Sequence, residues 1–345
     1  MKVVSAAGVL YKQGNEAMRQ GFVILDLEWG NIRVGLDWST RWRSLDIDTA
    51  KLSFGYADGG VNILRLRLNP TYFLKVQEAG LEAATTLKDI KGASKRLCNV
   101  GIAYKELGEF KTAIQHYEQA LPLAQQIQDK ETEAALFSNL GVAYEILGEP
   151  LKSMDFFERA ITLAHLTHNS RSEGISWCNL GNAHAALKQF DRAISCFEKA
   201  VGISGSIGDR HAVSIALGNL GTAACDLDNF EAAVAYQTQA LEIARELGDK
   251  RAEGVILSNL GKAYAGLERA EEAIEYYVQA LDLARRTGDR RGEGRRLKRL
   301  GDIHLRIGFE AEAANYFTAS LAILDEVEPS KAIYVRESLK KLGHN

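Results

Sequence analysis

Apolar residues recur along most of the chain with the spacing of amphipathic helices. One set is spaced three and four residues apart and comprises Leu257, Leu260, Ala263, Tyr264 and Leu267. A second set follows at the same spacing and comprises Ala273, Ile274, Tyr277, Ala280 and Leu281. Residues spaced in this way lie on one face of an α-helix. Polar turns containing glycine, such as 107–109 and 248–250, separate the sets and mark helix ends. The pattern predicts helical hairpins.

The hairpin pattern repeats every forty residues without insertion or deletion. Glycine fills one column of this repeat, at Gly101, Gly141, Gly181, Gly221, Gly261 and Gly301. An aromatic residue fills another column, at Tyr117, Phe157, Phe197, Tyr277 and Phe317. We expect the glycines to let neighbouring helices approach closely while the aromatic rings fill the space beside them. A period this strict indicates one supersecondary unit stacked many times.

These columns predict an all-α solenoid with four parts. Residues 1–50 form a helical N-terminal segment, 51–90 a degenerate repeat, 91–327 six repeats, and 328–345 a C-terminal capping helix. The last helix carries Ile333, Leu339 and Leu342 on one side and charges on the other. A polar outer face of this kind is what the open end of a solenoid requires. Pro122 and Pro150 are expected at or near helix starts, where proline is tolerated.

The repeat resembles the tetratricopeptide repeat family over residues 70–327. Its signature of Trp, Leu-Gly, Tyr, Ala, Phe and Ala corresponds to Trp177, Leu180, Gly181, His184, Ala193, Phe197 and Ala200. The period of forty, rather than thirty-four, is similar to that of Leu-Gly-Asn repeat proteins and kinesin light chains. The resemblance implies a right-handed α-solenoid that acts as a protein-interaction scaffold. It also implies that the first helix of each repeat lines the concave side.

The N-terminal segment resembles a different family. Glu28, Trp29, Asn31, Ile32 and Arg33 match the connector that precedes the repeats in bacterial Apaf-like signal-transduction NTPases. Three of the four tryptophans, Trp29, Trp38 and Trp42, lie in this segment. No GxxxxGK[ST] loop occurs in the chain, so no bound nucleotide is expected. No other cofactor is expected either. This likeness supports an alternative function, the sensor arm of such an NTPase without its nucleotide-binding core.

Composition narrows the choice of partner and compartment. Lys and Arg number 42 against 45 Asp and Glu, a net charge of −3, so no overall field favours nucleic acid or a membrane surface. No apolar stretch approaches the length of a membrane span. The four cysteines form no CxxC pair and are expected to be reduced thiols. The short apolar opening stretch faintly resembles a signal peptide, but it ends at Lys12 and no convincing small-residue cleavage site follows, so secretion is not expected. We therefore expect a cytoplasmic protein.

One polar column stands out on the predicted inner stripe of the first helices. It holds Asn99, Asn139, Asn179, Asn219 and Asn259, with Asn182 and Lys262 on the same stripe. An asparagine amide donates and accepts at once, so a ladder of them can hold a peptide backbone whatever its side chains. The resembling families are understood to bind extended peptides in this way. Alternatively, each asparagine bonds locally or within the repeat stack, and duplication of one ancestral repeat would produce the column too.

A basic cluster follows where a sixth asparagine is due. Residues 285–306 contain nine basic and three acidic residues. Arg295, Lys298 and Arg299 share a face and are suited to hold a carboxylate or phosphate of the ligand. The alternative is a solvated basic face, which fits residues 285–291 better. Nucleic acid is a less favoured partner because no aromatic residues interleave the charges.

Catalytic chemistry finds little support in the chain. The seven histidines show no HExxH or paired metal spacing, and no nucleophile motif is present. We therefore expect no enzyme activity, no catalytic residue and no metal site. The preferred hypothesis is a scaffold that binds a protein or peptide, with acidic peptides among the candidate ligands, through the asparagine column and the basic end. The alternatives are the sensor arm described above and a self-assembling structural protein.

Overall fold

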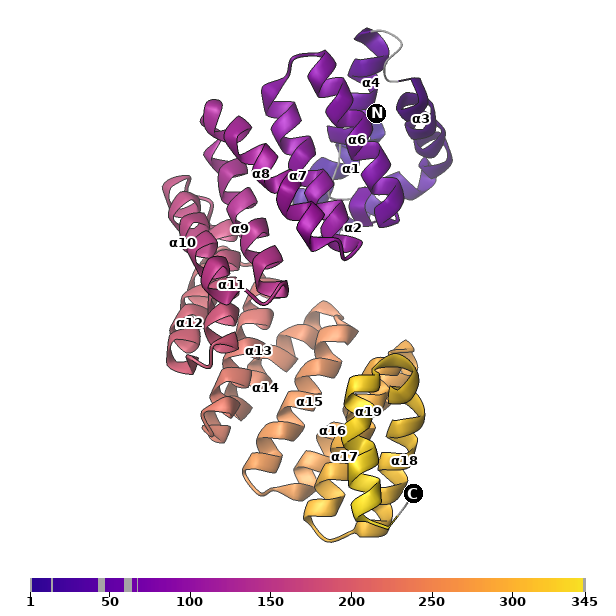
Figure 1. The fold of residues 1–345 in the computed structure, drawn as a ribbon, viewed down its shortest axis with the longest axis vertical. Helices are drawn as coiled ribbons and strands as arrows, with labels where there is room; N and C mark the ends of the chain where they lie inside the picture. Colours follow the sequence, from indigo (N-terminus) through magenta and orange to yellow (C-terminus); the bar gives the residue numbers. More distant parts are fainter. Residues whose placement is uncertain (1, 14, 43–46, 59–63, 67, 344–345) are drawn as a thin grey trace. The chain divides into compact units, whose positions relative to one another are not determined.

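The computed structural model describes residues 2–13, 15–42, 47–58, 64–66 and 68–343 (Figure 1). Every element in these residues is a helix, which confirms the all-α class. Contacts between residues divide the chain into two compact units, Met1–Ser176 and Trp177–Asn345. Each unit is an α-solenoid of stacked helical hairpins.

The N-terminal unit begins with four helices, α1 (Lys2–Gln13), α2 (Asn15–Leu27), α3 (Trp29–Trp42) and α4 (Ile47–Asp58). The regular hairpins follow as α6 (Pro70–Thr86), α7 (Ile90–Glu106), α8 (Phe110–Gln126), α9 (Lys130–Ile146) and α10 (Pro150–Leu166). Consecutive helices pack against one another, α7 on α8 and α9 on α10 most extensively. The first helix of a hairpin is therefore an odd-numbered one from α7 onward.

Helix α11 (Ser170–Ala186) begins in the N-terminal unit and continues into the C-terminal one. The C-terminal unit then contains α12 (Phe190–Ser206), α13 (Arg210–Asp226), α14 (Phe230–Leu247), α15 (Lys250–Gly266), α16 (Ala270–Thr287), α17 (Arg290–Arg306), α18 (Glu310–Val327) and α19 (Pro329–Lys341). The pairs α13–α14, α15–α16 and α17–α18 are the hairpins of this unit.

The turns explain why the period is so regular. A residue with positive φ ends a helix every twenty residues, at Lys88, Gly108, Gln128, Gly148, His168, Lys188, Gly208, Asp228, Gly248, Glu268, Gly288 and Gly308. The left-handed conformation ends a helix and lets its last carbonyls accept hydrogen bonds. Each first helix then starts at an Asp or Asn whose side chain accepts from a backbone N–H one turn on, as Asp249 does from Ala252 at 2.9 Å. Such caps fix where the helix begins.

The glycine column makes room for the aromatic column. A Cβ added to Gly261 would lie 2.7 Å from ring carbons of Tyr277, and one at Gly301 would lie 2.6 Å from Phe317. Both distances are too short for a real contact. The two helices of a hairpin can therefore pack around the buried ring only because the first helix lacks a side chain at this point. The predicted roles of both columns are confirmed.

The start of the N-terminal unit has its own small core. Val4, Ala7, Leu25, Ile32 and Leu36 are buried together, with Trp29 partly buried against them. Trp38 is exposed, and the side chain of Trp42 lies outside the described residues. Trp29 and Trp38, the two tryptophans of this segment whose side chains are described, therefore do not lie in one buried cluster.

Helix α19 covers the last hairpin. Ala332, Val335 and Leu339 are buried against Phe317 and Leu324 of α18. The charged residues of α19 lie mainly on its exposed side, as a capping helix requires.

One expectation about proline was wrong. Pro150 is the first residue of α10, but Pro122 lies inside α8. Pro122 is exposed, and so is Glu118 one turn earlier. The Glu118 carbonyl, which loses its helical hydrogen bond to the proline, lies on the solvent side, where water can satisfy it.

Candidate functional site

The asparagine column joins neighbouring helices in the N-terminal unit. Asn99 donates to Gln77 Oε1 of α6 at 3.1 Å. Asn139 donates to the Ala135 carbonyl at 3.0 Å and to Cys98 Sγ of α7 at 3.9 Å. Both asparagines are half-buried. In this unit the column contributes to packing between repeats.

The column is linked in a similar way in the C-terminal unit. Asn219 on α13 donates to Asn182 Oδ1 of α11 at 3.1 Å and to Cys178 Sγ at 3.4 Å. Asn259 on α15 donates to Thr222 Oγ1 of α13 at 3.3 Å. Asn179 is half-buried on α11. Among the described residues, none donates a hydrogen bond to the Oδ1 of Asn219 or Asn259. Asn219 therefore donates two hydrogen bonds within the stack and Asn259 one, and both amides still offer an acceptor.

Lys262 continues the links between first helices. Its Nζ lies 2.7 Å from Asp226 Oδ1 of α13. Further along, Arg306 of α17 donates to the Ala265 carbonyl of α15. The first helices of this unit are thus joined by polar contacts on one side, where the sequence places the predicted stripe.

Exposed aliphatic residues lie beside the asparagines on this stripe. Ile215 is 45% exposed and Val255 is 51% exposed. Each lies four residues before an asparagine, Asn219 or Asn259, and so occupies the same helical face one turn away. An apolar side chain next to a polar group with an open acceptor is suited to contact an extended peptide.

The basic residues predicted as an anchor are largely paired within the protein. Arg295 donates twice to Glu328, at 2.7 Å each. Lys298 Nζ lies 2.8 Å from Asp302 Oδ2 and stands over the Tyr334 ring. Arg299 is half-exposed and reaches the same Asp302 only at 3.8 Å. Of these three, Arg299 is the least constrained.

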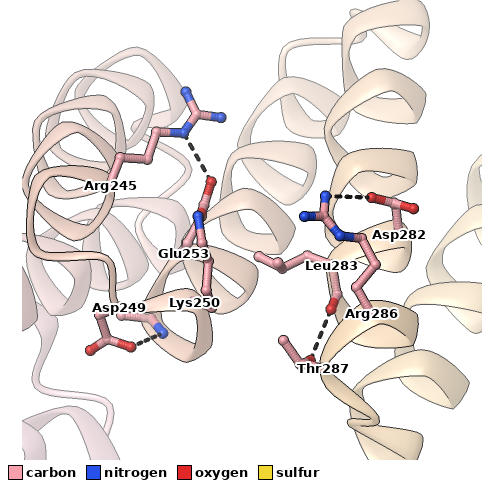
Figure 2. A network of polar contacts seen from close by, with 9 residues as sticks. Arg245, Asp249, Lys250, Glu253, Asp282, Leu283, Arg286 and Thr287 are labelled. Carbon is pink, nitrogen blue, oxygen red and sulfur yellow. Dashed lines mark hydrogen bonds and ion pairs between the residues drawn. The ribbon is translucent and has the colours of Figure 1, made fainter.

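The turns on the basic side also carry ion pairs. Figure 2 shows Arg245 facing Glu253 across the turn between α14 and α15, and Arg286 beside Asp282 on α16. Burial alone would raise the pKa of the Glu253 carboxyl, but hydrogen bonds from Lys250 and Arg245 bring that pKa below its usual range. Arg285 and Arg290 both pair with Glu293 at 3.0 Å. Much of the basic excess is therefore neutralised locally.

Two adjoining cavities remain positively charged. The larger, here called the Arg296 cavity, has a volume of about 620 Å³ and lies between α15, the end of α16 and α17. The charged residues that line it are Lys250, Arg251, Asp289, Arg291, Arg295 and Arg296. The smaller has a volume of about 350 Å³ and is lined by Ser258, Arg295, Lys298, Arg299, Leu324 and Lys331. Asn259 and Val255 lie on the wall of the Arg296 cavity, so it opens onto the stripe of first helices.

Arg296 is the most unusual residue in this region. It is only 6% exposed, and its Nε has no hydrogen-bond partner among the described residues. Its Nη1 lies 3.6 Å from Asp289 Oδ2, beyond hydrogen-bond distance. Burial lowers the pKa of this guanidinium, and Asp289 opposes that effect. A buried cation with so loose a partner is costly to the fold.

Sequence reasoning counted Arg296 in the basic cluster but did not select it as a site residue. The signal that singles it out is a spaced triplet, Asp289-Gly292-Arg296. A Cβ at Gly292 would lie about 2 Å from both Asp289 and Arg296, so glycine lets the two side chains approach. The same triplet occurs once more in the repeats, as Asp89, Gly92 and Arg96.

The remaining chemistry-bearing groups are unremarkable in their surroundings. None of the four cysteines, all of which lie in the described residues, forms a disulfide, and burial raises the pKa of the Cys98 thiol to about 11. In the described part of the chain no cluster of His, Cys, Asp and Glu side chains is arranged to hold a metal ion. None of the described helices is both long and apolar enough to cross a membrane.

The stacked hairpins define a helical-repeat protein. More specifically, the chain belongs to the tetratricopeptide repeat family, whose sequence model matches residues 93–164, 172–246 and 253–326. Proteins of this family are interaction scaffolds and are generally non-catalytic. No curated protein sequence matches the chain.

Several solved structures share the fold. BtubC from P. vanneervenii is 19% identical and matches 64% of this chain and 93% of its own, with a TM-score of 0.58. A STAND signal-transduction ATPase with a tetratricopeptide repeat sensor, from Pyrococcus horikoshii, is 16% identical with a TM-score of 0.66. That match covers 96% of this chain but about half, 51%, of the ATPase. A Rap protein complexed with Competence and Sporulation Factor is 14% identical over 91% of this chain and 99% of its own, with a TM-score of 0.53.

Proposed function

We propose that this scaffold binds an extended, acidic segment of a partner protein along the first helices of its C-terminal unit. The segment lies across α13, α15 and α17, beside Asn219 and Asn259. Asn99 and Asn139 provide the same column in the N-terminal unit, and Asn179 and Asn182 provide it on α11. Their participation in one ladder stays a prediction.

The observation that carries the proposal is the pairing of exposed Ile215 and Val255 with Asn219 and Asn259. Covering these aliphatic side chains with a ligand removes apolar surface from water, at about 25 cal/mol for each Å². The asparagine Oδ1 atoms accept from backbone N–H groups of the segment, because Asn219 already donates two hydrogen bonds within the stack and Asn259 donates one. Of these two asparagines, Asn219 therefore offers the ligand its acceptor alone, while Asn259 also keeps one N–H donor.

Charge gives the docked segment a direction. The stripe ends at Arg295, Lys298 and Arg299, and Arg299 has the weakest internal partner. An acidic side chain of the ligand can share Arg299 without displacing a short ion pair. Arg295 and Lys298 remain paired with Glu328 and Asp302. They attract the ligand through the positive electrostatic potential of the smaller cavity.

A selection experiment tests this function. Random peptides of about twelve residues displayed on phage are selected on the intact chain, and the best binders are synthesised with a fluorescent label. Fluorescence anisotropy then gives their affinities. We expect Asn219→Ala with Asn259→Ala to weaken binding about tenfold, the effect of two lost hydrogen bonds. Arg286→Ala, which changes an exposed arginine on α16, is the matched control.

Two outcomes would contradict the proposal. One is selected peptides that bind the double asparagine variant as well as the unchanged protein, which would leave the column with a packing role alone. The other concerns charge. Arg299→Glu should weaken the binding of acidic peptides and leave neutral peptides nearly unchanged, and equal effects on both would remove the direction assigned here.

A second candidate function is the sensor arm of a STAND-type NTPase. It is favoured by the fold likeness to the Pyrococcus horikoshii ATPase, which extends over 96% of this chain, and by the connector-like residues around Trp29. Exposed Trp38 would then contact the nucleotide-binding core. The reading frame upstream of the repeats tests this candidate. A P-loop encoded there supports the sensor arm, and a frame without one supports a separate scaffold.

A further inference from the structure

Arg96 lies at the same repeat position as Arg296 and shows which contacts stabilise a buried arginine there. The residues at the same repeat position are Arg96, Leu136, Ser176, Ala216, Ile256 and Arg296. Four of the six are apolar or small, so a cation here is an exception that occurs only in the first and last repeats. Both cations follow a capping aspartate and a glycine, which makes the two sites directly comparable.

In the N-terminal unit the guanidinium of Arg96 is covered by other residues. Gln77 Oε1 accepts a hydrogen bond from its Nη1 at 3.2 Å. The ring of Phe54, on α4, lies 5.7 Å from its central carbon. A cation over an aromatic face is stabilised by the ring quadrupole. Arg96 is 1% exposed and serves as part of the packing.

In the C-terminal unit the covering residue is replaced by glycine. Phe54 lies forty-two positions before Arg96, and Gly254 lies forty-two positions before Arg296. A Cβ added to Gly254 would stand 3.4 Å from Arg296 Nη2, so position 254 faces the guanidinium as Phe54 faces Arg96. The space that a larger side chain would fill is the Arg296 cavity, which Gly254 and Arg296 both line.

The lining of the cavity indicates what fits there. Lys250, Arg251, Arg291 and Arg295 surround Arg296, and Asp289 is the carboxylate among the described residues that line the cavity. Lys250 and Arg295 already pair with Glu253 and Glu328, so Arg251, Arg291 and Arg296 carry the excess of positive charge that favours a ligand with more than one negative charge. Guanidinium groups match the oxygens of phosphate in geometry as well as in charge. The Ser258 hydroxyl on the wall adds a further polar group.

We propose that the Arg296 cavity binds a phosphoryl group, held by the Arg296 guanidinium from within and by Arg251 and Arg291 at its sides. The source of the phosphoryl group is a phosphorylated side chain in the docked segment. This assignment of the source rests on the proposed function. Asn259 and Val255 on the wall of the same cavity place the site next to the stripe on which that segment lies. Inorganic phosphate tests the cavity without any peptide.

Two variants distinguish a loss of ligand binding in the cavity from a loss of folding. Arg296→Ile introduces the residue of the preceding repeat, Ile256, and removes the buried charge. Gly254→Phe introduces the residue of the first unit, Phe54, and fills the space while every cation stays in place. Arg286→Ala removes an arginine whose side chain is 71% exposed on α16 and leaves the cavity unchanged.

Calorimetric titration with inorganic phosphate in a chloride buffer provides the measurement. We expect saturable binding to the unchanged chain, a loss of about tenfold or more in both cavity variants, and a change within about twofold in Arg286→Ala. Circular dichroism confirms that each variant is folded. Equal affinity in all four proteins, or binding that never saturates, would overturn the site. If Arg296→Ile does not fold, the Gly254→Phe variant decides alone.

Phosphopeptides then identify the source of the group. Peptides selected on the chain are made with and without phosphoserine and titrated into the unchanged chain and into Arg296→Ile. We expect phosphorylation to tighten binding to the unchanged chain and to have little effect on the variant. If phosphate binds but peptide phosphorylation has no effect, the assigned source is wrong and a free phosphorylated molecule occupies the cavity. If selected peptides bind well while phosphate does not, the phosphoryl site fails and the proposed function stands.

Discussion

Arg96 and Arg296 occupy the same column, follow the same Asp and Gly, and are both buried, yet their surroundings differ. Arg96 donates a hydrogen bond from the edge of its guanidinium to Gln77 Oε1 and has the Phe54 ring near its face. Arg296 has a loose contact with Asp289 and an open cavity where a ring would stand. Two residues account for the difference. Gly254 replaces Phe54 on the preceding first helix, and Tyr277 occupies the repeat position of Gln77. A buried cation can thus serve packing in one repeat and be available to a ligand in another.

The largest expected effect comes from removing each arginine in turn. Arg96→Ile should lower the free energy of unfolding of the N-terminal unit by about 2–3 kcal/mol, because a hydrogen bond, a cation–π contact and packing are lost together. Arg296→Ile should be neutral or stabilising, since an apolar residue replaces a poorly paired buried charge. Urea unfolding with hydrogen exchange of α6, α7 and α17 measures both. Equal destabilisation of the two units would show that the surroundings of Arg296 stabilise it as well as Gln77 and Phe54 stabilise Arg96.

Two glycines on α15 allow a closely packed position to be compared with one that borders the Arg296 cavity. Gly261→Ala forces a Cβ to within 2.7 Å of the Tyr277 ring and should cost about 1–2 kcal/mol, even after the gain in helix propensity. Gly254→Ala places its Cβ 3.4 Å from Arg296 Nη2 and should be neutral or stabilising by up to about 1 kcal/mol. Thermal unfolding of the two variants measures the difference. A Gly254→Ala variant as unstable as Gly261→Ala would show that position 254 is closely packed.

Arg295 offers a contrast with Arg296 on the same helix, because it has a well-placed carboxylate. Hydrogen bonds from Arg295 hold the pKa of Glu328 below the ordinary value of 4.5, and burial opposes them only in part. A carboxyl with a lowered folded-state pKa adds stability that is complete above its unfolded pKa and is lost as the pH falls through the folded value. We expect α19, which begins next to Glu328, to exchange amide hydrogens faster as the pH falls below about 4.5.

The matched variant for this pH effect is Glu328→Gln. It should exchange faster than the unchanged chain at neutral pH and show little further pH dependence in α19, once the intrinsic exchange rate is corrected for. An unaltered pH dependence in this variant would assign the effect to other carboxyl groups.

The smallest expected effect concerns the asparagine column. Asn219→Ala loses hydrogen bonds to Asn182 and Cys178, but alanine has a higher helix propensity, so the net change in unfolding free energy should be within about 1 kcal/mol. Chemical unfolding measures that change. A loss well above this value would indicate that the column exists mainly to hold the first helices together, as the alternative interpretation of the sequence states.

The sequence predicts the fold well because the information is local. Spacings of three and four residues place Leu257 and Leu260 on one face, and the glycine column predicts where the Tyr277 ring packs. The sequence could not decide whether Asn219 and Asn259 bond to the preceding first helix or bind a ligand. Whether a side chain reaches the neighbouring repeat depends on how the helices pack. Glu328 as the partner of Arg295 could not be predicted, since it lies thirty-three residues away at the start of the capping helix.

The Arg296 cavity could not be predicted from the sequence for a related reason. Column-by-column inspection compares Arg296 with Ile256 and Arg96, but the residue that decides its environment, Gly254, belongs to another column of another repeat. Glycine there looks ordinary, because Gly174 occurs at the same position. Only the packing of α15 against α17 shows that position 254 faces the guanidinium.

The most direct test of the comparison is a phosphate titration of three proteins, the unchanged chain, Gly254→Phe and Arg96→Ile. If the open space beside Arg296 is the binding site, the unchanged chain and folded Arg96→Ile bind phosphate with the same affinity, and Gly254→Phe loses about tenfold or more. Phosphate binding that survives Gly254→Phe unchanged would contradict the account.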